Sequence, residues 1–137
     1  MADHTFNISI VTPDGTVYDS DATMIIFKTQ NGEMGILANH IPVLASLLID
    51  VVRVKNGNSE DKIAVNGGFI EFSNNSATIV ADSAEPATKI DVARAQKAKT
   101  RAEEHIQHAH EVNDKDELSR AEVALKRAAN RLRVSQK

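Results

Sequence analysis

The chain has 137 residues, a formal net charge of −3 and no cysteine. The lack of cysteine excludes a disulfide framework and a cysteine-based zinc site, and it fits a reducing compartment. The longest apolar stretch, residues 41–49, contains Pro42 and ends at Asp50. It is therefore far shorter than the roughly 20 apolar residues that cross a bilayer. Residues 1–6 have no basic region followed by an apolar run, so we expect a soluble protein without a secretory signal or membrane insertion.

Composition divides the chain at Pro86. All 6 glycines, 3 prolines, 4 phenylalanines and the 1 tyrosine lie in residues 1–86, and residues 87–137 have none. Residues 1–86 carry four basic and eleven acidic side chains, whereas residues 87–137 carry twelve basic and eight acidic ones. Because glycine and proline turn the backbone, the sequence predicts an acidic, β-rich module over residues 1–86 and a basic, helical module over residues 87–137.

The first module has the pattern of short strands separated by turns. Residues 6–10 alternate apolar and polar side chains, and residues 12–15 have turn chemistry. Asn56 and Gly57 form a strong hairpin signal, since both tolerate positive φ. Further strands are expected at residues 16–18, 22–29, 36–37, 48–55, 62–65, 69–72 and 77–81, with residues 32–35 as an interruption. This spacing indicates an antiparallel β-sandwich or flattened barrel.

The first module shows no catalytic motif. It lacks a phosphate-binding loop, a nucleophile elbow and a dinucleotide-binding glycine fingerprint. Gly67 and Gly68 are most simply explained by a turn or bulge between strands. His40 lies in a loop without a serine or cysteine nucleophile context, so we interpret it as structural or exposed. The residues therefore favour a protein that is not an enzyme.

The second module predicts two helices joined by a short loop. The first helix is expected right after Pro86, with Thr88 as its N-cap and Asp91 near the positive end of the helix dipole. Residues 112–115 break the pattern, and residues 114–117 give a second capping signal. The apolar seams are Ala95, Ala98, Ala102, Ile106 and Ala109, then Leu118, Ala121, Leu125, Ala128 and Leu132. A short loop makes the pair an antiparallel hairpin.

Alanine dominates the predicted seam between the helices. Burial stabilises by about 25 cal/mol per Å² of apolar surface, and alanine offers little surface. High helix propensity with weak packing suggests segments that stay helical while they change partners. We therefore expect the hairpin to detach or melt before the sandwich does.

Four arginines of the second module are spaced to share helix faces. Arg94 and Arg101 are seven residues apart, and Arg127 and Arg131 are four apart. One interpretation is a solvated charged face with weak surface ion pairs. The other is an anion site, for a nucleotide phosphate or an acidic protein surface. The residues leave both open, but the absence of aromatic side chains argues against nucleic acid.

Histidines also gather in the second module. His105 and His108 share a helix face, whereas His110 lies elsewhere. No third ligand for that face is evident in the sequence, so no metal site is predicted.

Four stretches of the chain resemble a known family. They are residues 11–15 (VTPDG), 32–42 (GEMGILANHIP), 65–69 (VNGGF) and 90–95 (IDVARA). In this order, with the change from sandwich to helices between the last two, they resemble the epsilon subunit of bacterial F-type ATP synthase. The resemblance covers the full length of the chain.

This resemblance implies a non-catalytic subunit of the central rotor stalk. In the family, the sandwich binds the gamma subunit and the ring of membrane c subunits, coupling proton-driven rotation to ATP synthesis. The helical hairpin regulates: it folds against the sandwich or extends along gamma, where it contacts alpha and beta and inhibits ATP hydrolysis. The implied location is peripheral, on the cytoplasmic face of the bacterial cell membrane, with no required cofactor and ATP as a regulatory ligand.

The resemblance also implies an ATP site in the folded hairpin. The family motif Ile/Leu-Asp-x-x-Arg-Ala is present at residues 90–95. Its presence favours the interpretation of the arginines as an anion site over that of a solvated charged face. The arginines would hold phosphates, while Glu85 and Asp91 would orient base or ribose groups and buttress Arg94. The implied site residues are Glu85, Ile90, Asp91, Arg94, Arg101, Arg127 and Arg131.

The loop at residues 32–42 implies the rotor contact. Its candidate contact residues are Glu33, Met34, His40 and Ile41. Here the sequence has Ala38-Asn39 where many members have Pro-Gly, which leaves the backbone shape of the loop open. Two alternatives to a stalk subunit are a free-standing nucleotide-sensing adaptor with the same modules and, with least support, a small enzyme.

Overall fold

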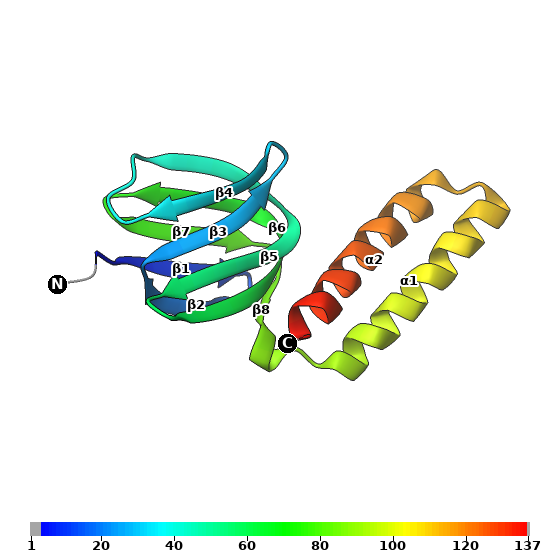
Figure 1. Ribbon diagram of the computed structural model, residues 1–137. Coiled ribbons are helices and arrows are strands. Elements are labelled where there is room, and N and C mark those ends of the chain that lie inside the picture. The colour runs from blue at the N-terminus through cyan, green and yellow to red at the C-terminus, as the bar shows by residue number, and fades with distance from the viewer. Residues whose placement is uncertain (1–3, 137) are drawn as a thin grey trace.

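The computed structural model describes residues 4–136, a β-sandwich followed by two long helices (Figure 1). The strands are β1 (Phe6–Thr12), β2 (Gly15–Ala22), β3 (Met24–Thr29), β4 (Gly32–Leu37), β5 (Val43–Asn56), β6 (Ser59–Ser73), β7 (Ser76–Ala81) and β8 (Ala84–Pro86). A short 3₁₀ helix, η1 (Ala87–Lys89), precedes α1 (Val92–Val112) and α2 (Lys115–Ser135). The expected fold class, a β-sandwich and then an antiparallel helical hairpin, is confirmed.

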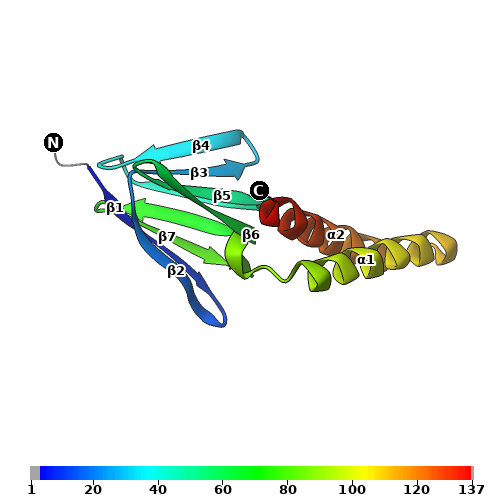
Figure 2. The same ribbon diagram turned by 60° about the horizontal axis from the view of Figure 1, so that its bottom comes forward.

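The strands follow the order β2-β1-β7-β6-β5-β3-β4, and β8 pairs with β6. Neighbouring strands are antiparallel except for β1 and β7, which run parallel with Asn7 opposite Ser76. Figure 2 shows these two strands side by side. The first strand is therefore held by one of the last strands of the sandwich.

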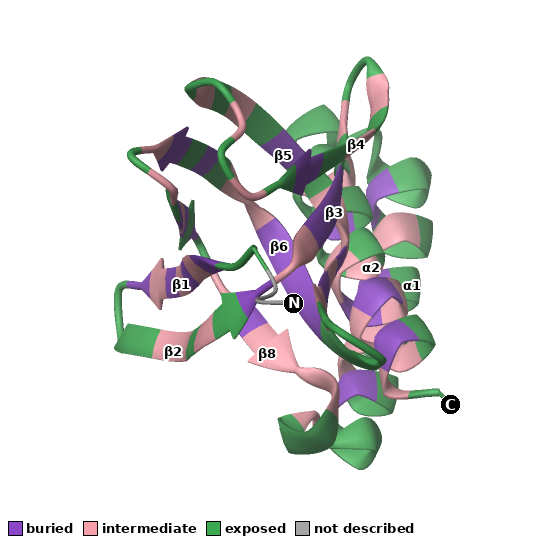
Figure 3. Ribbon diagram, turned by 60° about the vertical axis from the view of Figure 1, so that its left-hand side comes forward, coloured by how far each residue is buried: buried purple, intermediate pink, exposed green. Residues whose placement is uncertain are grey.

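The core of the sandwich follows from the alternation in the strands. Along β1, Phe6, Ile8 and Ile10 are buried while the residues between them are partly exposed. The ring of Phe6 meets the ring of Phe72 edge-on, with centroids 5.4 Å apart. Burying each such side chain stabilises by about 1.5–3 kcal/mol, so the sandwich has a hydrophobic core of its own. Figure 3 shows the buried positions along the strands.

The two strands expected at residues 62–65 and 69–72 are one strand, β6, so Gly67 and Gly68 lie inside a strand and not, as predicted, in a turn or bulge between two. Its first half pairs with β8 around Ala64, and its second half pairs with β7 from Gly68 onward. Gly67 and Gly68 have φ of 87° and 131°. A Cβ on Gly68 would lie 2.1 Å from the carbonyl oxygen of Val80. Glycine is required here because the strand changes partner at a point of close backbone approach.

Two further expectations about the strands are wrong. Residues 32–35 do not interrupt the sheet, because they begin β4, which pairs with β3 from Thr29 opposite Gly32. Gly35 lies inside this strand, where a Cβ would come within 2.7 Å of Met24 Cε. The strand expected at residues 48–55 begins earlier, at Val43. Pro42 lies just before the strand and thus removes no ladder hydrogen bond.

The start of the first helix is also corrected. What begins right after Pro86 is the 3₁₀ helix η1, which contains Thr88; Ile90 is extended, and α1 starts only at Val92. Asp91 is the N-cap of α1, since its carboxylate accepts the Arg94 backbone N–H at 3.0 Å. An aspartate is at least as good a cap as a threonine, and Asp91 itself has the extended backbone conformation that an N-cap requires, with φ of −81° and ψ of 99°.

The capping signal predicted for the second helix is confirmed. Asp114 is the N-cap of α2, and its carboxylate accepts the Glu117 backbone N–H at 3.0 Å. Asn113 ends α1 in the left-handed region, with φ of 55°. A two-residue connection therefore reverses the chain and makes the helices antiparallel.

Alanines form the buried seam between the helices, as predicted. The fully buried positions are Ala95, Ala102 and Ala109 in α1 and Ala121 and Ala128 in α2. Their spacing of seven keeps one face of each helix against the other. Helix α2 lies against β5, β6 and η1, and α1 packs on its outer side (Figures 1 and 3). The sandwich is therefore in contact mainly with α2.

Candidate functional site

A groove of about 930 Å³ runs between the two helices. Three of the four spaced arginines line it: Arg101 from α1, and Arg127 and Arg131 from α2. Arg120 also lines the groove, about two helical turns before Arg127 and three before Arg131. It was not among the residues predicted from the sequence. The expected convergence of the two arginine pairs is therefore found for three of their members.

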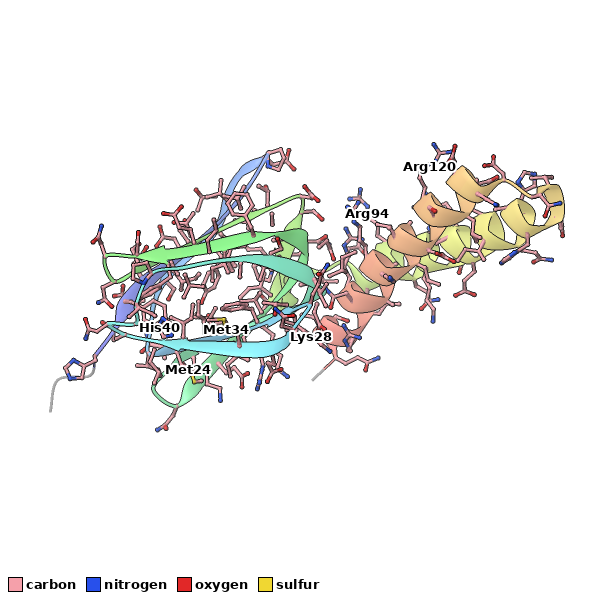
Figure 4. All side chains as sticks on the ribbon, turned by 90° about the horizontal axis from the view of Figure 1, so that it is seen from above. Met24, Lys28, Met34, His40, Arg94 and Arg120 are labelled. Atoms are coloured by element: carbon pink, nitrogen blue, oxygen red, sulfur yellow. The ribbon has the colours of Figure 1, made fainter. Side chains whose placement is uncertain are left out.

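Arg94 does not line the groove. Its side chain is exposed at the start of α1, and Figure 4 shows that it projects to the same side of the hairpin as Arg120. Asp91 supports Arg94 through the backbone N–H, as the helix cap, and not through the guanidinium. Ile90 is half-buried beside them. The IDVARA segment thus forms the entry to α1 at the base of the hairpin.

Two carboxylates of the sandwich meet the arginines of α2. Arg131 Nε donates to Glu85 Oε1 at 2.8 Å, and Arg127 Nη2 lies 3.7 Å from Asp82 Oδ2. Arg127 Nε is buried and has no hydrogen-bond partner among the described residues. Glu85 and Arg131 were both candidate residues, whereas no pattern in the sequence pointed to Asp82, because this contact depends on how the two modules dock.

Charges in the groove favour anions. Arg101 and Arg120 have no carboxylate within 4.0 Å in residues 4–136, so their charges face the groove uncompensated. Glu117 and Asp114 occupy the end near the interhelical loop. Planar guanidinium groups from both helices can bind phosphate oxygens with paired N–H donors. The geometry therefore fits a phosphate-bearing ligand along the arginine end of the groove.

Two of the three histidines of α1 meet one carboxylate of α2. His105 Nδ1 and His108 Nδ1 each lie 3.0 Å from an oxygen of Glu117. Hydrogen bonds from His105 and then His108 hold the pKa of Glu117 below its usual range. Sequence reasoning placed the two histidines on one face but missed Glu117, which lies on the other helix. Within residues 4–136, no cluster of histidine and acidic side chains has the arrangement of a metal site.

The loop after β4 has a defined shape. Asn39 takes the left-handed region with φ of 65°, and its N–H donates to the Asn75 side chain at 2.7 Å. Asparagine tolerates this conformation nearly as glycine does, so the departure from the Pro-Gly pattern keeps a tight turn. His40 packs edge-on against Phe72, with ring centroids 6.2 Å apart, and its Nδ1 lies 2.7 Å from the Ile41 carbonyl oxygen. These contacts agree with a structural role for His40.

The other rotor-contact candidates differ in exposure. Ile41 is 74% exposed, Met34 packs against the core, and Glu33 is exposed and pairs with Arg53 at 3.4 Å. Only Ile41 presents a large free apolar surface.

An apolar surface that the sequence did not predict covers one face of β5, β6 and β7. Leu44 is 74% exposed, and Leu48, Phe69 and Val80 are also exposed. Phe69 lies directly opposite Val80 across the β6–β7 pair, and Ser46 lies between Leu44 and Leu48 on β5, opposite Phe69. The signal was in β5, where two of the three exposed positions from Leu44 to Leu48 are leucine, whereas a solvated strand would carry polar residues. Such a surface marks a protein contact.

Comparison with known families gives two matches that together cover most of the chain. The family model described as the ATP synthase delta/epsilon chain, β-sandwich domain, matches residues 5–87. The model for the long α-helix domain of the same chain matches residues 88–136.

Curated relatives are similar over nearly their whole length. The ATP synthase epsilon chain of Pediococcus pentosaceus is 60% identical over 129 residues, which are 93% of each chain. That of Levilactobacillus brevis is 55% identical over 98% of this chain and 99% of its own. That of Bacillus pumilus is 48% identical over 97% and 98%.

Solved structures share the fold. A chain in the mitochondrial ATP synthase of Euglena gracilis matches 93% of this chain and 79% of its own, with a TM-score of 0.76 at 23% identity. No helix within residues 4–136 has the length and apolar character that crossing a membrane requires. On the family matches and the bacterial relatives, the chain belongs to the epsilon chains of the F-type ATP synthases, non-catalytic subunits of the central stalk.

Proposed function

We propose that this chain couples rotation of the stalk to ATP synthesis and that its helical hairpin is a brake on ATP hydrolysis. The sandwich binds the gamma subunit and the c-ring, on the cytoplasmic face of the bacterial membrane. The hairpin inhibits hydrolysis when it leaves the sandwich and contacts alpha and beta. ATP, bound in the arginine groove as a regulatory ligand, favours the docked hairpin.

The observation that carries the nucleotide part is the arginine groove beside Glu85. Arg101, Arg127 and Arg131 come from two helices, and Arg131 is already oriented by Glu85 at 2.8 Å. A ligand that bridges α1, α2 and the sandwich stabilises only the docked arrangement, since undocking separates Arg131 from Glu85. This is the property that a regulatory ligand of the hairpin needs.

The seam and the docking surface support the brake. The helices meet through alanines, and two of the ion pairs between α2 and the sandwich, Arg127–Asp82 and Arg133–Asp50, have exposed members. Exposed ion pairs contribute about 0–1 kcal/mol each. A free-energy difference of a few kcal/mol between docked and extended hairpins is small enough for a ligand or a partner subunit to reverse.

The rotor binds through the exposed apolar surface of the sandwich. Leu44 and Phe69 on the sheet face and Ile41 on the loop are all exposed. These residues add exposed apolar side chains to the candidates Glu33, Met34, His40 and Ile41. Co-purification of a stoichiometric complex with gamma is the expected result. A chain that binds nucleotide tightly but never associates with gamma would instead fit the nucleotide-sensing adaptor.

Calorimetric titration of the intact chain with ATP tests the groove. We expect saturable binding that Arg127→Ala weakens by about tenfold or more, because a charge-assisted contact to phosphate contributes roughly 1.5–3 kcal/mol. Lys126→Ala is the matched control, since this neighbouring cation is exposed and does not line the groove. No heat of binding at millimolar ATP would contradict the nucleotide site.

A further inference from the structure

Two asparagines are buried at the contact between the modules. Asn66 of β6 and Asn130 of α2 are 0% and 1% exposed. They are 64 residues apart in sequence, yet Asn130 Nδ2 donates to Asn66 Oδ1 at 3.5 Å. A buried amide without a partner destabilises a protein, so a facing pair of buried amides at this junction requires an explanation.

A chain of hydrogen bonds continues from both members of the pair. On the sandwich side, Asn66 Nδ2 donates to Ser83 Oγ at 3.0 Å. On the helix side, Arg133 Nη2 donates to Asn130 Oδ1 at 3.0 Å and to Asp50 Oδ1 at 3.2 Å. Each amide is thus oriented by a second partner in its own module. The amides therefore face each other in one orientation only.

The ion pairs of α2 with the sandwich are more exposed than the amide pair. Arg127 and Asp82 have side chains 38% and 72% exposed, and the Arg133 side chain is 61% exposed. Arg131 and Glu85 are less exposed, at 22% and 35%, but they too are reached by water. Exposed ion pairs tolerate changes of geometry because water replaces either partner. A buried amide pair does not, since its hydrogen bond is directional and shielded from water.

We propose that Asn66 and Asn130 are a positioning pair that sets the register in which α2 docks on the sandwich. A shift of α2 by one residue would place Ala129 or Arg131 opposite Asn66 and leave its amide without this partner. In the native register, the residue after Asn130 reaches Glu85. The pair thereby decides which arginine of the groove the sandwich orients.

The same chemistry keeps docking reversible. When α2 leaves, both amides pass into water and regain hydrogen bonds there, so release leaves neither amide without a partner. The pair specifies the docked position without making it permanent. Its regulatory meaning rests on the proposed brake, but the docking itself does not.

Distance measurements on the full chain test the pair. The chain has no cysteine, so Asn58→Cys and Glu122→Cys, both exposed, place one spin label on each module. Double electron–electron resonance should give one dominant distance for the otherwise native chain. Asn130→Ala is expected to raise the undocked fraction about tenfold, the effect of losing one buried hydrogen bond. Adding Asn66→Ala to Asn130→Ala should change little further, because the shared contact is already lost.

Two comparisons keep the result interpretable. Gln96→Ala removes an exposed amide of the hairpin and should leave the distances native. Asn130→Leu keeps the side-chain volume and the helix but not the hydrogen bond, and it should resemble Asn130→Ala. Hydrogen exchange of β5 and β6 in the same samples shows that the sandwich stays folded. Native distances in both Asn130 variants, or effects of Asn66→Ala and Asn130→Ala that simply add, overturn the proposal.

Failure of the brake is distinguishable from failure of the pair. The label distances need neither gamma nor nucleotide. If they change as expected while removal of the hairpin leaves ATP hydrolysis by the assembled complex unaltered, the pair stands and the brake does not. If hydrolysis rises on removal of the hairpin but the variant distances remain native, the pair is wrong.

Discussion

The backbone conformation and the pKa of single residues depend on neighbours that the sequence pattern shows only in part. Gly68 was expected in a turn or bulge, and it stands where β6 changes from β8 to β7. The sequence marked the position but not its reason, which is the approach of the β7 backbone. At Asn39 the opposite holds: a residue other than glycine takes a left-handed φ, and the loop keeps its tight turn.

Gly68→Ala is expected to destabilise the sandwich strongly. The new Cβ would lie 2.1 Å from the Val80 carbonyl oxygen, at a φ of 131°. We expect a loss of more than about 2 kcal/mol in the free energy of unfolding, measured by urea denaturation. Gly15→Ala is the control, since its φ is also positive but no atom lies within 4 Å, and it should cost only about 1 kcal/mol. Equal losses would contradict the steric explanation.

Tyr18 should make the stability of the chain fall at high pH. Burial, and then its hydrogen bond to Asp61 at 2.8 Å, raise the pKa of Tyr18 to about 12 from 10.0. The folded chain therefore holds this proton more tightly than the unfolded chain does. The stabilisation is complete below pH 10 and is lost as the pH rises toward 12. Tyr18→Phe should remove this slope in urea midpoints measured between pH 9 and about pH 12; an unchanged slope would assign it to other groups.

Whole elements were predicted where the pattern is local. The alanine seams and the Asp114 cap follow from spacing within one helix, and the structure has both. The errors arose where packing decides: residues 32–35 join a strand because β3 lies beside them, and the start of α1 is set by the 3₁₀ turn after β8. Local propensity carries no information about which segments become neighbours in the fold.

The two helices are expected to exchange amide hydrogens faster than the sandwich does. Their buried seam is alanine, whereas β5 and β6 pair along most of their length over a core of large side chains. Local opening of the hairpin therefore exposes little apolar surface and requires less free energy. Hydrogen-exchange mass spectrometry should show lower protection in α1 and α2 than in β5 and β6. Equal protection in both modules would rule out a loosely held hairpin.

At the scale of the molecule, the sequence predicted both modules and most of the candidate site but not their junction. Arg101, Arg127 and Arg131 were identified from spacing and resemblance. Asp82 and the Asn66–Asn130 pair were not, because these contacts join residues far apart in sequence through the docked position of α2. No local pattern encodes that position; it is a property of two folded surfaces.

Removal of residues 87–137 should leave a folded sandwich. The hydrophobic core cluster lies wholly within the strands, from Phe6 to Ala84. We expect the shortened chain to unfold cooperatively in urea and to give the dispersed amide NMR spectrum of a folded β protein. Its free energy of unfolding should fall only modestly, because the docking surface becomes exposed. An unfolded or aggregated product would show instead that the sandwich needs the hairpin to fold.

The parallel pairing of β1 with β7 also orders events during synthesis. Asn7 leaves the ribosome long before its partner Ser76, so β1 has only β2 beside it until nearly the whole sandwich has been made. The sandwich closes when β7 arrives, and α2 is made last of all. The hairpin thus meets a sandwich that is already complete, and a newborn chain would acquire its rotor-binding half before the half proposed to restrain the enzyme.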